Sequence, residues 1–201
     1  SEINYNSKLQ EKLIFLLINI LEKNNHINFV FSATKMIPNL GNNHWYKSPT
    51  RVQLKKLSKD PTTLFYENFI PTPSATFIRK SKVDILFDSN LIWAVDIDYY
   101  IKVLIDNDYL YIDKPLITIN HNNENQITFE VENDKDINLY ELFYLYEKIY
   151  KYNFSDQKYL RKRINKLLRD FKVKTTWEIR NAGYVGVLPI FVYLQLLKNN
   201  I

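Results

Sequence analysis

The chain of 201 residues contains no cysteine and only three glycines. Without cysteine it has neither a disulfide framework nor a thiolate metal site, and it is suited to a reducing compartment. Scarce glycine argues against a glycine-rich loop that cradles phosphate groups. No uncharged apolar run reaches the roughly 18 residues of a membrane-spanning helix. The nearest candidate, 184–197, carries Pro189 and has the length of a core or interfacial helix.

The composition is that of a globular protein, with 46% hydrophobic and 24% charged residues. The net charge is +5, and the excess is concentrated between Lys148 and Lys174, where ten Lys or Arg face two acidic residues. Such a stretch attracts an anionic partner: a membrane surface, a nucleic acid or a sugar nucleotide. The plainer interpretation is a solvated helix face.

Local patterns predict an alternation of helices and strands. A capping box at Ser7 and Gln10, followed by leucines at helical spacing, predicts a helix over 8–23. β-Branched and aromatic residues predict a strand over 27–32. The same reasoning predicts further helices over 51–58 and 96–106, strands over 75–79, 110–112 and 116–119, and three or four helices beyond 138.

The most informative block runs from Phe69 to Thr128. It contains, in order, I-P-T-P-S-A-T-F-I-R-K-S-K-V, F-D-S-N-L-I-W-A-V-D-I-D-Y-Y-I-K-V-L and Y-I-D-K-P-L-I-T-I-N-H. This order resembles the second half of the catalytic domain of family-2 inverting glycosyltransferases: a P-S-x-x-x-R-K strand, an F-D-x-x-L turn and an E-D-x-D-L-x-x-R-L helix start. The earlier segments K-L-Q-E-K-L-I-F-L-L and I-N-F-V-F-S are similar to the helix and strand after the family's metal-binding D-x-D. The resemblance covers roughly residues 8–130.

The resemblance implies an α/β fold of the GT-A type. Residues 1–137 would form the acceptor-side half of the catalytic domain, with a mixed sheet, and 138–201 a mainly helical C-terminal extension. Nothing in the chain matches the nucleotide-binding half that carries the D-x-D, so we expect a fragment or processed form that is inactive by itself.

The implied reaction transfers a sugar from a nucleotide-sugar donor to a glycan or lipid-linked acceptor, with inversion. A divalent metal, Mn²⁺ or Mg²⁺, would balance the charge of the leaving diphosphate, with its main ligands upstream of this chain. The implied location is the cytoplasm, with peripheral contact to the inner face of the membrane.

Asp96 and Asp98 lie at the start of a predicted helix. Inverting transfer needs a carboxylate that takes the proton from the acceptor hydroxyl, and free N–H groups at a helix N-terminus hold such a carboxylate in place. By its match to the family pattern, Asp96 is the base and Asp98 an orienting partner. The pattern's Glu and Arg are replaced by Val95 and Lys102. The alternative is that both aspartates only cap the helix.

Other site residues follow from the same resemblance. Trp93 would be a platform for an acceptor sugar, unless it is a core residue. Ser74, Arg79 and Lys80 would contact the acceptor or a phosphate, unless they mark a charged strand end at the surface. His121, placed in a polar loop over 121–126, would reach the metal or diphosphate, unless it is merely solvated.

The helical extension gives a further candidate surface. Its basic helices suit an anionic membrane, and the residues predicted to contact it are Arg161, Lys162, Arg163, Lys166 and Arg169. The rival to an enzyme is a binding module without catalysis, in which these cations and Tyr150, Tyr152 and Tyr159 contact nucleic acid. No RNP, KH or helix-turn-helix signature supports nucleic acid binding.

Overall fold

The computed structural model describes residues 2–38, 43–80, 84–121, 131, 133–152 and 157–200, without the side chains of 2–12 and 121. These residues divide into two compact units between which the chain passes several times. The first comprises 1–54, 69–85 and 102–121, and the second 55–68, 86–101 and 122–201. The division falls inside helix α4, Val95–Ile105.

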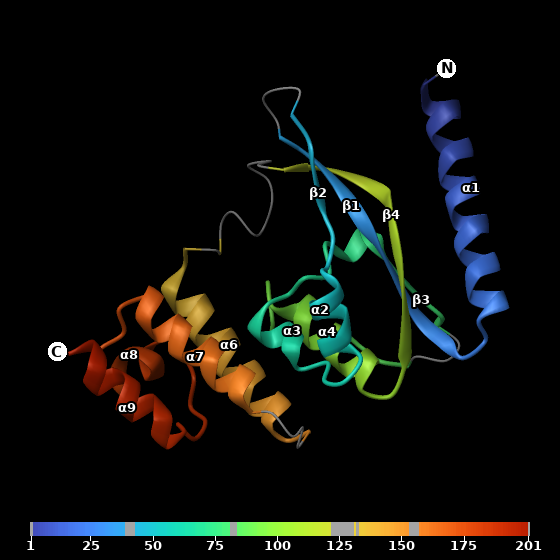
Figure 1. Ribbon diagram of the computed structural model, residues 1–201. Coiled ribbons are helices and arrows are strands. Elements are labelled where there is room, and N and C mark those ends of the chain that lie inside the picture. The colour runs from blue at the N-terminus through green and yellow to red at the C-terminus, as the bar shows by residue number, and fades with distance from the viewer. Residues whose placement is uncertain are drawn as a thin grey trace. The chain divides into compact units, whose positions relative to one another are not determined.

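The first unit is built on a mixed sheet around the long strand β1, Ile27–Pro38 (Figure 1). Strand β2, Trp45–Lys47, and strand β3, Thr76–Ile78, run antiparallel to β1 along different parts of it. Strand β4, Asp108–His121, runs parallel to β1. The predicted strands therefore do share one mixed sheet.

The two strands predicted over 110–112 and 116–119 form one strand, β4. Its register against β1 shifts where Ser32 pairs with Ile112 and the next residue, Ala33, pairs with Pro115. Two residues of β4 are thereby left out of the pairing. Proline has no N–H to donate to a ladder, so an irregularity at this position is expected. The Lys114-Pro115 pair interrupts the pairing with β1 without ending the strand.

Helix α1, Glu2–Lys23, packs on this sheet. Leu17 is buried together with Ile27 and Val30 of β1. Partly buried side chains from α1, β3 and β4 surround them: Leu13, Ile20, Leu21, Phe77, Leu110, Ile112 and Leu116. The unit also contains helix α2, Arg51–Leu57, through Leu54, and the short 3-10 turn η1, Pro73–Ala75.

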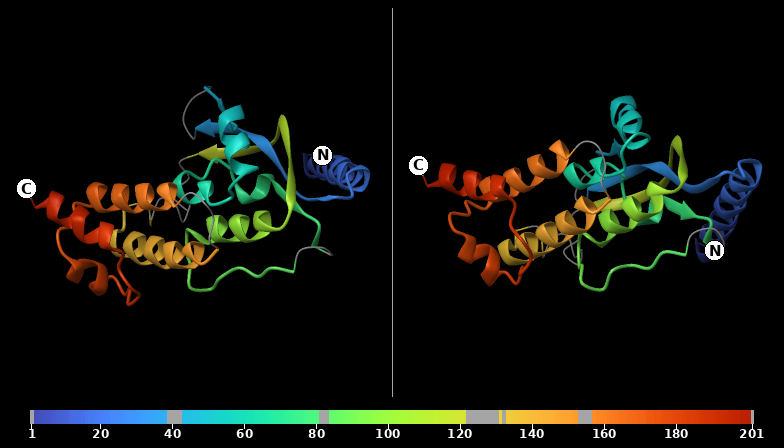
Figure 2. Two further views of the ribbon diagram at one scale, coloured as in Figure 1. Left: turned by 60° about the horizontal axis from the view of Figure 1, so that its bottom comes forward. Right: turned by 90° about the horizontal axis from the view of Figure 1, so that it is seen from below.

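The second unit is helical. It contains α3, Thr63–Tyr66, the start of α4, and the four helices of the C-terminal part: α6, Lys135–Tyr150, α7, Lys158–Asp170, α8, Thr176–Asn181, and α9, Ile190–Asn199. Helix α7 contacts α3, α6 and α9, and Figure 2 shows α6 and α7 running alongside each other. The fully buried side chains include Leu139, Leu142, Phe143, Ile164, Leu168, Ile179 and Val192.

Two helices of the C-terminal part, α6 and α8, begin with side-chain caps. Asp134 accepts from the backbone N–H of Ile137 at the start of α6. Thr175 and Glu178 form a capping box at the start of α8, and Lys135 pairs with Glu178. None of the helices within the described ranges is both long enough and apolar enough to cross a membrane.

Candidate functional site at the start of helix α4

Asp96 lies in the first turn of α4 and is half-buried. Burial raises the pKa of its carboxyl group, because the apolar surroundings disfavour the charged form. A carboxylate with a raised pKa binds a proton more strongly, which is the property of a general base. Asp96 is therefore partly accessible to solvent and has a raised pKa.

The segment that leads into α4 is held by Glu141 of α6, whose side chain is only 1% exposed. One carboxylate oxygen accepts from the N–H of Ile92, at 2.5 Å. The other accepts from the N–H of Trp93, at 3.2 Å, and of Ala94, at 2.8 Å. A buried carboxylate thus satisfies the free N–H groups before the helix and fixes the backbone that presents Trp93 and Asp96.

A second link between α4 and α6 is a buried ion-pair network. The ammonium group of Lys148 lies 2.5 Å from Asp88 and 2.7 Å from Asp98. Asp88 also accepts from the hydroxyl of Tyr144, at 3.0 Å, and from the backbone N–H of Asn90, at 2.9 Å. The F-D-S-N-L turn is thereby tied to α6.

The charges in this network are stabilised by their partners. Burial alone would raise the pKa of Asp88, but hydrogen bonds from Lys148, Asn90 and Tyr144 lower it well below its ordinary value. Burial alone would lower the pKa of Lys148, but Asp88 and Asp98 raise it. Asp98 is 2% exposed and engaged with Lys148, so it holds α4 in place and does not share the accessible position of Asp96.

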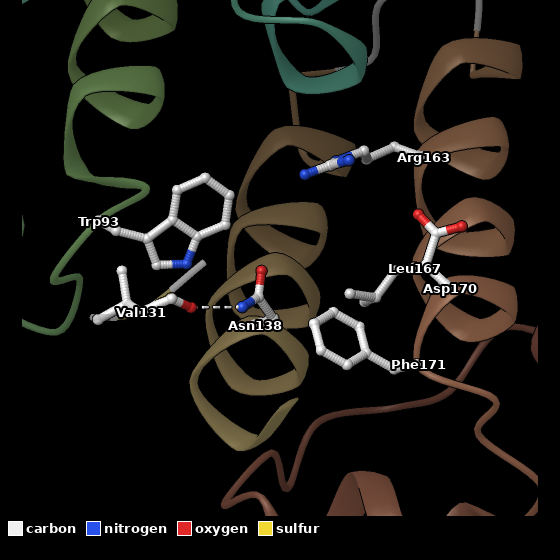
Figure 3. A pocket seen from close by; sticks show the side chains of 7 residues that line it. All are labelled: Trp93, Val131, Asn138, Arg163, Leu167, Asp170 and Phe171. Carbon is white, nitrogen blue, oxygen red and sulfur yellow. Dashed lines mark hydrogen bonds between the residues drawn. The ribbon is translucent and has the colours of Figure 1, made fainter. Parts of the chain in front are cut away.

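Trp93 lines a cavity of about 280 Å³ within the helical unit (Figure 3). Trp93 stands on one side, and Arg163 and Asp170 of α7 and the following residue Phe171 form the other side. The remaining lining residues are Val131, Asn138 and Leu167. Trp93 is thus neither fully exposed nor a core residue, since its ring forms the wall of a cavity. Asp96 does not line this cavity.

Two donors in the cavity wall have no hydrogen-bond partner among the described residues: the indole N–H of Trp93 and the Nε–H of Arg163. Burial lowers the pKa of Arg163, and the nearby carboxylate of Asp170 opposes that shift. The amide of Asn138 is already used, donating to the carbonyl of Val131 at 2.9 Å. Unpartnered buried donors favour an additional acceptor in the cavity.

The remaining predicted site residues lie in the sheet unit. Ser74 is exposed in η1, and Lys80 forms an exposed pair with Asp84, at 3.5 Å. The guanidinium of Arg79 donates to the carbonyl of Leu21 near the end of α1, which is a structural use of the charge. His121 is the last residue of β4 and does not begin a loop, and its side chain is outside the described part.

Four of the five cations predicted to contact an anionic membrane are exposed on α7. The exposed cations are Arg161, Lys162, Lys166 and Arg169. Arg163 differs, because it is half-buried in the cavity wall. Lys148, which the charge count of the sequence included, is held by the buried carboxylates and is unavailable to an outside anion.

Sequence reasoning missed the residues of α6 that organise the site. Glu141, Tyr144 and Lys148 are spaced three and four residues apart, so they lie on one face of the helix. A signal was available: Glu141 sits among the buried residues Leu139, Leu142 and Phe143. A charged residue within an apolar run indicates a buried partner.

Among the residues described, no three His, Asp or Glu side chains are placed to hold a metal ion. Comparisons with family models, with curated proteins and with solved structures found no match to this chain.

Proposed function

We propose that this chain is the acceptor-side part of an inverting glycosyltransferase with Asp96 as its general base. The observation that supports this most strongly is the combination at the start of α4: a half-buried carboxylate with a raised pKa, on a backbone segment fixed by the buried Glu141. An aspartate that only caps a helix would accept from free backbone N–H groups at the helix start. Here Glu141 already accepts from the N–H groups of Ile92 and Trp93, which precede the helix.

The proposed reaction is a single displacement. The acceptor hydroxyl oxygen forms a bond to the anomeric carbon while the bond from that carbon to the nucleoside diphosphate breaks. Asp96 takes the hydroxyl proton as the oxygen attacks, so its raised pKa strengthens it as a base. Asp98 is a positioning residue, because its ion pair with Lys148 holds the helix that carries Asp96.

The cavity beside Trp93 suits one sugar ring of the acceptor. Its volume of about 280 Å³ accommodates a pyranose, and the rings of Trp93 and Phe171 offer apolar surfaces for its C–H faces. The N–H groups of Trp93 and Arg163, which have no partner among the described residues, would donate to ring or hydroxyl oxygens, while Asp170 would accept from hydroxyls. The opposite charges of Arg163 and Asp170 favour a neutral, hydroxylated ligand over a simple anion.

The described residues do not form a complete site for the divalent metal that the resemblance implies. We therefore assign it no step. A metal would supply charge stabilisation for the leaving diphosphate.

The alternative is a module that binds nucleic acid through tyrosines and cations. One of its three tyrosines, Tyr159, already packs within the protein. The ring of Tyr159 lies 6.0 Å from that of Tyr66, and the ammonium of Lys56 is 5.3 Å from its centre. Since Tyr159 is engaged within the protein, we favour the transferase.

The test is turnover by the full-length protein with nucleotide-sugar donors, followed as release of nucleoside diphosphate. Asp96→Asn keeps the size of the side chain but removes the base, so kcat should fall by about 10²–10⁴-fold. Asp136→Asn changes an exposed aspartate in the first turn of another helix, α6, and should leave kcat unchanged. A kcat for Asp96→Asn within a few-fold of wild type would exclude this role.

A further inference from the structure

The segment before and within α9 exposes an unusual number of aliphatic side chains. Val185 is 89% exposed, Val187 86% and Ile190 79%. Leu194 and Leu197 follow Ile190 at spacings of four and three residues, so the three share one face of α9, and both are exposed. Val192 and Leu196 occupy the opposite, buried face. We call the five exposed residues, Val185, Val187, Ile190, Leu194 and Leu197, the aliphatic patch.

These residues are not needed for the packing of the helical unit. The buried face of α9 already contacts α7, and Asn199 donates to the carbonyls of Leu168 and Val173 to fix its end. A contiguous stretch of exposed aliphatic residues is costly in water and typically marks a contact surface.

The charges near the aliphatic patch are mostly positive. Over 157–200, ten Lys or Arg accompany only two acidic residues, Asp170 and Glu178. Glu178 is already neutralised by Lys135, and Lys166 lies 3.6 Å from Asp170. The remaining positive charge of α7 and α8 is complementary to an anionic surface.

A pocket is lined by residues from both α7 and the start of α9. Pro189 and Phe191, on either side of Ile190, line a cavity of about 390 Å³ together with Arg161 of α7. The guanidinium of Arg161 lies 5.5 Å from the centre of the Phe191 ring. Lys158, Gln157, Tyr146 and Tyr150 complete the lining. The cation could contact a lipid phosphate, and the exposed aliphatic residues beside it could contact the acyl chains below that phosphate.

We propose that the aliphatic patch inserts into an anionic phospholipid surface while Arg161 and its neighbours on α7 contact the lipid phosphates. The patch supplies apolar burial at the acyl boundary, and the cations supply attraction to the anionic lipid. This inference is independent of the proposed catalysis, because it uses neither Asp96 nor the Trp93 cavity.

The experiment is co-sedimentation of the 201-residue chain with vesicles of phosphatidylcholine alone or of phosphatidylcholine with phosphatidylglycerol. The chain should bind the anionic vesicles and bind the neutral ones far more weakly. Ile190→Ser with Leu197→Ser removes two inserting side chains and should weaken binding by at least about tenfold. Arg161→Gln with Lys162→Gln removes two cations and should also weaken it by about tenfold.

Matched controls use equally exposed residues elsewhere. Val52→Ser with Leu86→Ser removes two exposed aliphatic side chains, and Arg51→Gln with Lys55→Gln removes two exposed helix cations. Both controls should bind as the wild type does. Equal losses in controls and test variants would overturn the proposal, as would a wild-type chain that stays in solution. A dimer in analytical ultracentrifugation that Ile190→Ser with Leu197→Ser dissociates would also overturn it, because a second copy would then cover the patch.

Discussion

At the scale of single residues, Asp96 is unusual because folding works against its charge. Its pKa is raised by burial, so the folded chain binds the proton of Asp96 more tightly than the unfolded chain does. The stability that depends on this group is fully present at pH values below its ordinary pKa of 3.8 and is lost as the pH rises through the folded pKa. At neutral pH the ionised carboxylate is therefore a cost to the fold.

Asp96→Asn should consequently raise Tm at pH 7, and the gain should vanish when the pH falls below 3.8. Thermal unfolding followed by circular dichroism at both pH values measures this. Asp136→Asn is the control, because Asp136 also lies in a first helical turn but is exposed. Removing the charge of Asp136 should lower Tm slightly or leave it unchanged. A Tm for Asp96→Asn that falls at pH 7 would indicate a capping role.

At the scale of elements, α6 holds α4 in place through two independent sets of contacts. Glu141 binds three backbone N–H groups before α4, and Lys148 binds Asp98 within it. Each set places charge in a buried position, where an unpaired group is expensive. Losing either set of contacts should therefore lower the free energy of unfolding more than losing a surface ion pair does.

Glu141→Gln replaces one accepting oxygen by an amide NH₂, which cannot accept from a backbone N–H. Buried donors are left without partners, so the free energy of unfolding should fall by about 2–3 kcal/mol. Glu67→Gln affects an exposed glutamate and should cost less than about 1 kcal/mol. Urea denaturation of both variants makes the comparison. Equal losses would mean that Glu141 contributes no more than a surface charge.

Lys148→Met leaves Asp88 and Asp98 facing each other without their cation. Breaking such a buried pair should lower the free energy of unfolding by about 3–5 kcal/mol, whereas Lys166→Met, which affects an exposed pair, should change it by less than about 1 kcal/mol.

The pH dependence of Lys148→Met is a second readout. The pKa of Asp88 is lowered in the folded state, so its ionised carboxylate stabilises the fold above pH 3.8. This contribution to the free energy of unfolding is lost as the pH falls further. Lys148→Met should weaken this acid dependence. Urea denaturation as a function of pH measures it, and a wild-type acid dependence in the variant would remove Lys148 as its cause.

At the scale of the whole molecule, features set by neighbouring residues were predictable from the sequence. Contacts between residues far apart in the chain were not. Strand and helix segments follow from side chains a few residues apart, so three of the four strand positions and a helical C-terminal part were predictable. The mixed sheet itself was expected only from the family resemblance. The contacts that arrange the candidate site join residues far apart: Glu141 binds residues 47 to 49 positions away, and Lys148 reaches Asp88 over 60 positions. Periodicity carries no information about such pairs. The division of the chain into two interleaved units is likewise set by long-range packing, not by a linker composition.

The pH dependence of kcat/KM for the full-length protein, wild type against Asp96→Asn, shows whether Asp96 is the general base. In the wild type, kcat/KM should fall on the acid side with a midpoint above 3.8, the ordinary value for this carboxyl, because protonation removes the base. In Asp96→Asn the rate should be lower by about 10²–10⁴-fold and this acid limb should be absent. An acid limb of unchanged midpoint in Asp96→Asn would show that another group is the base and would contradict the role proposed for Asp96.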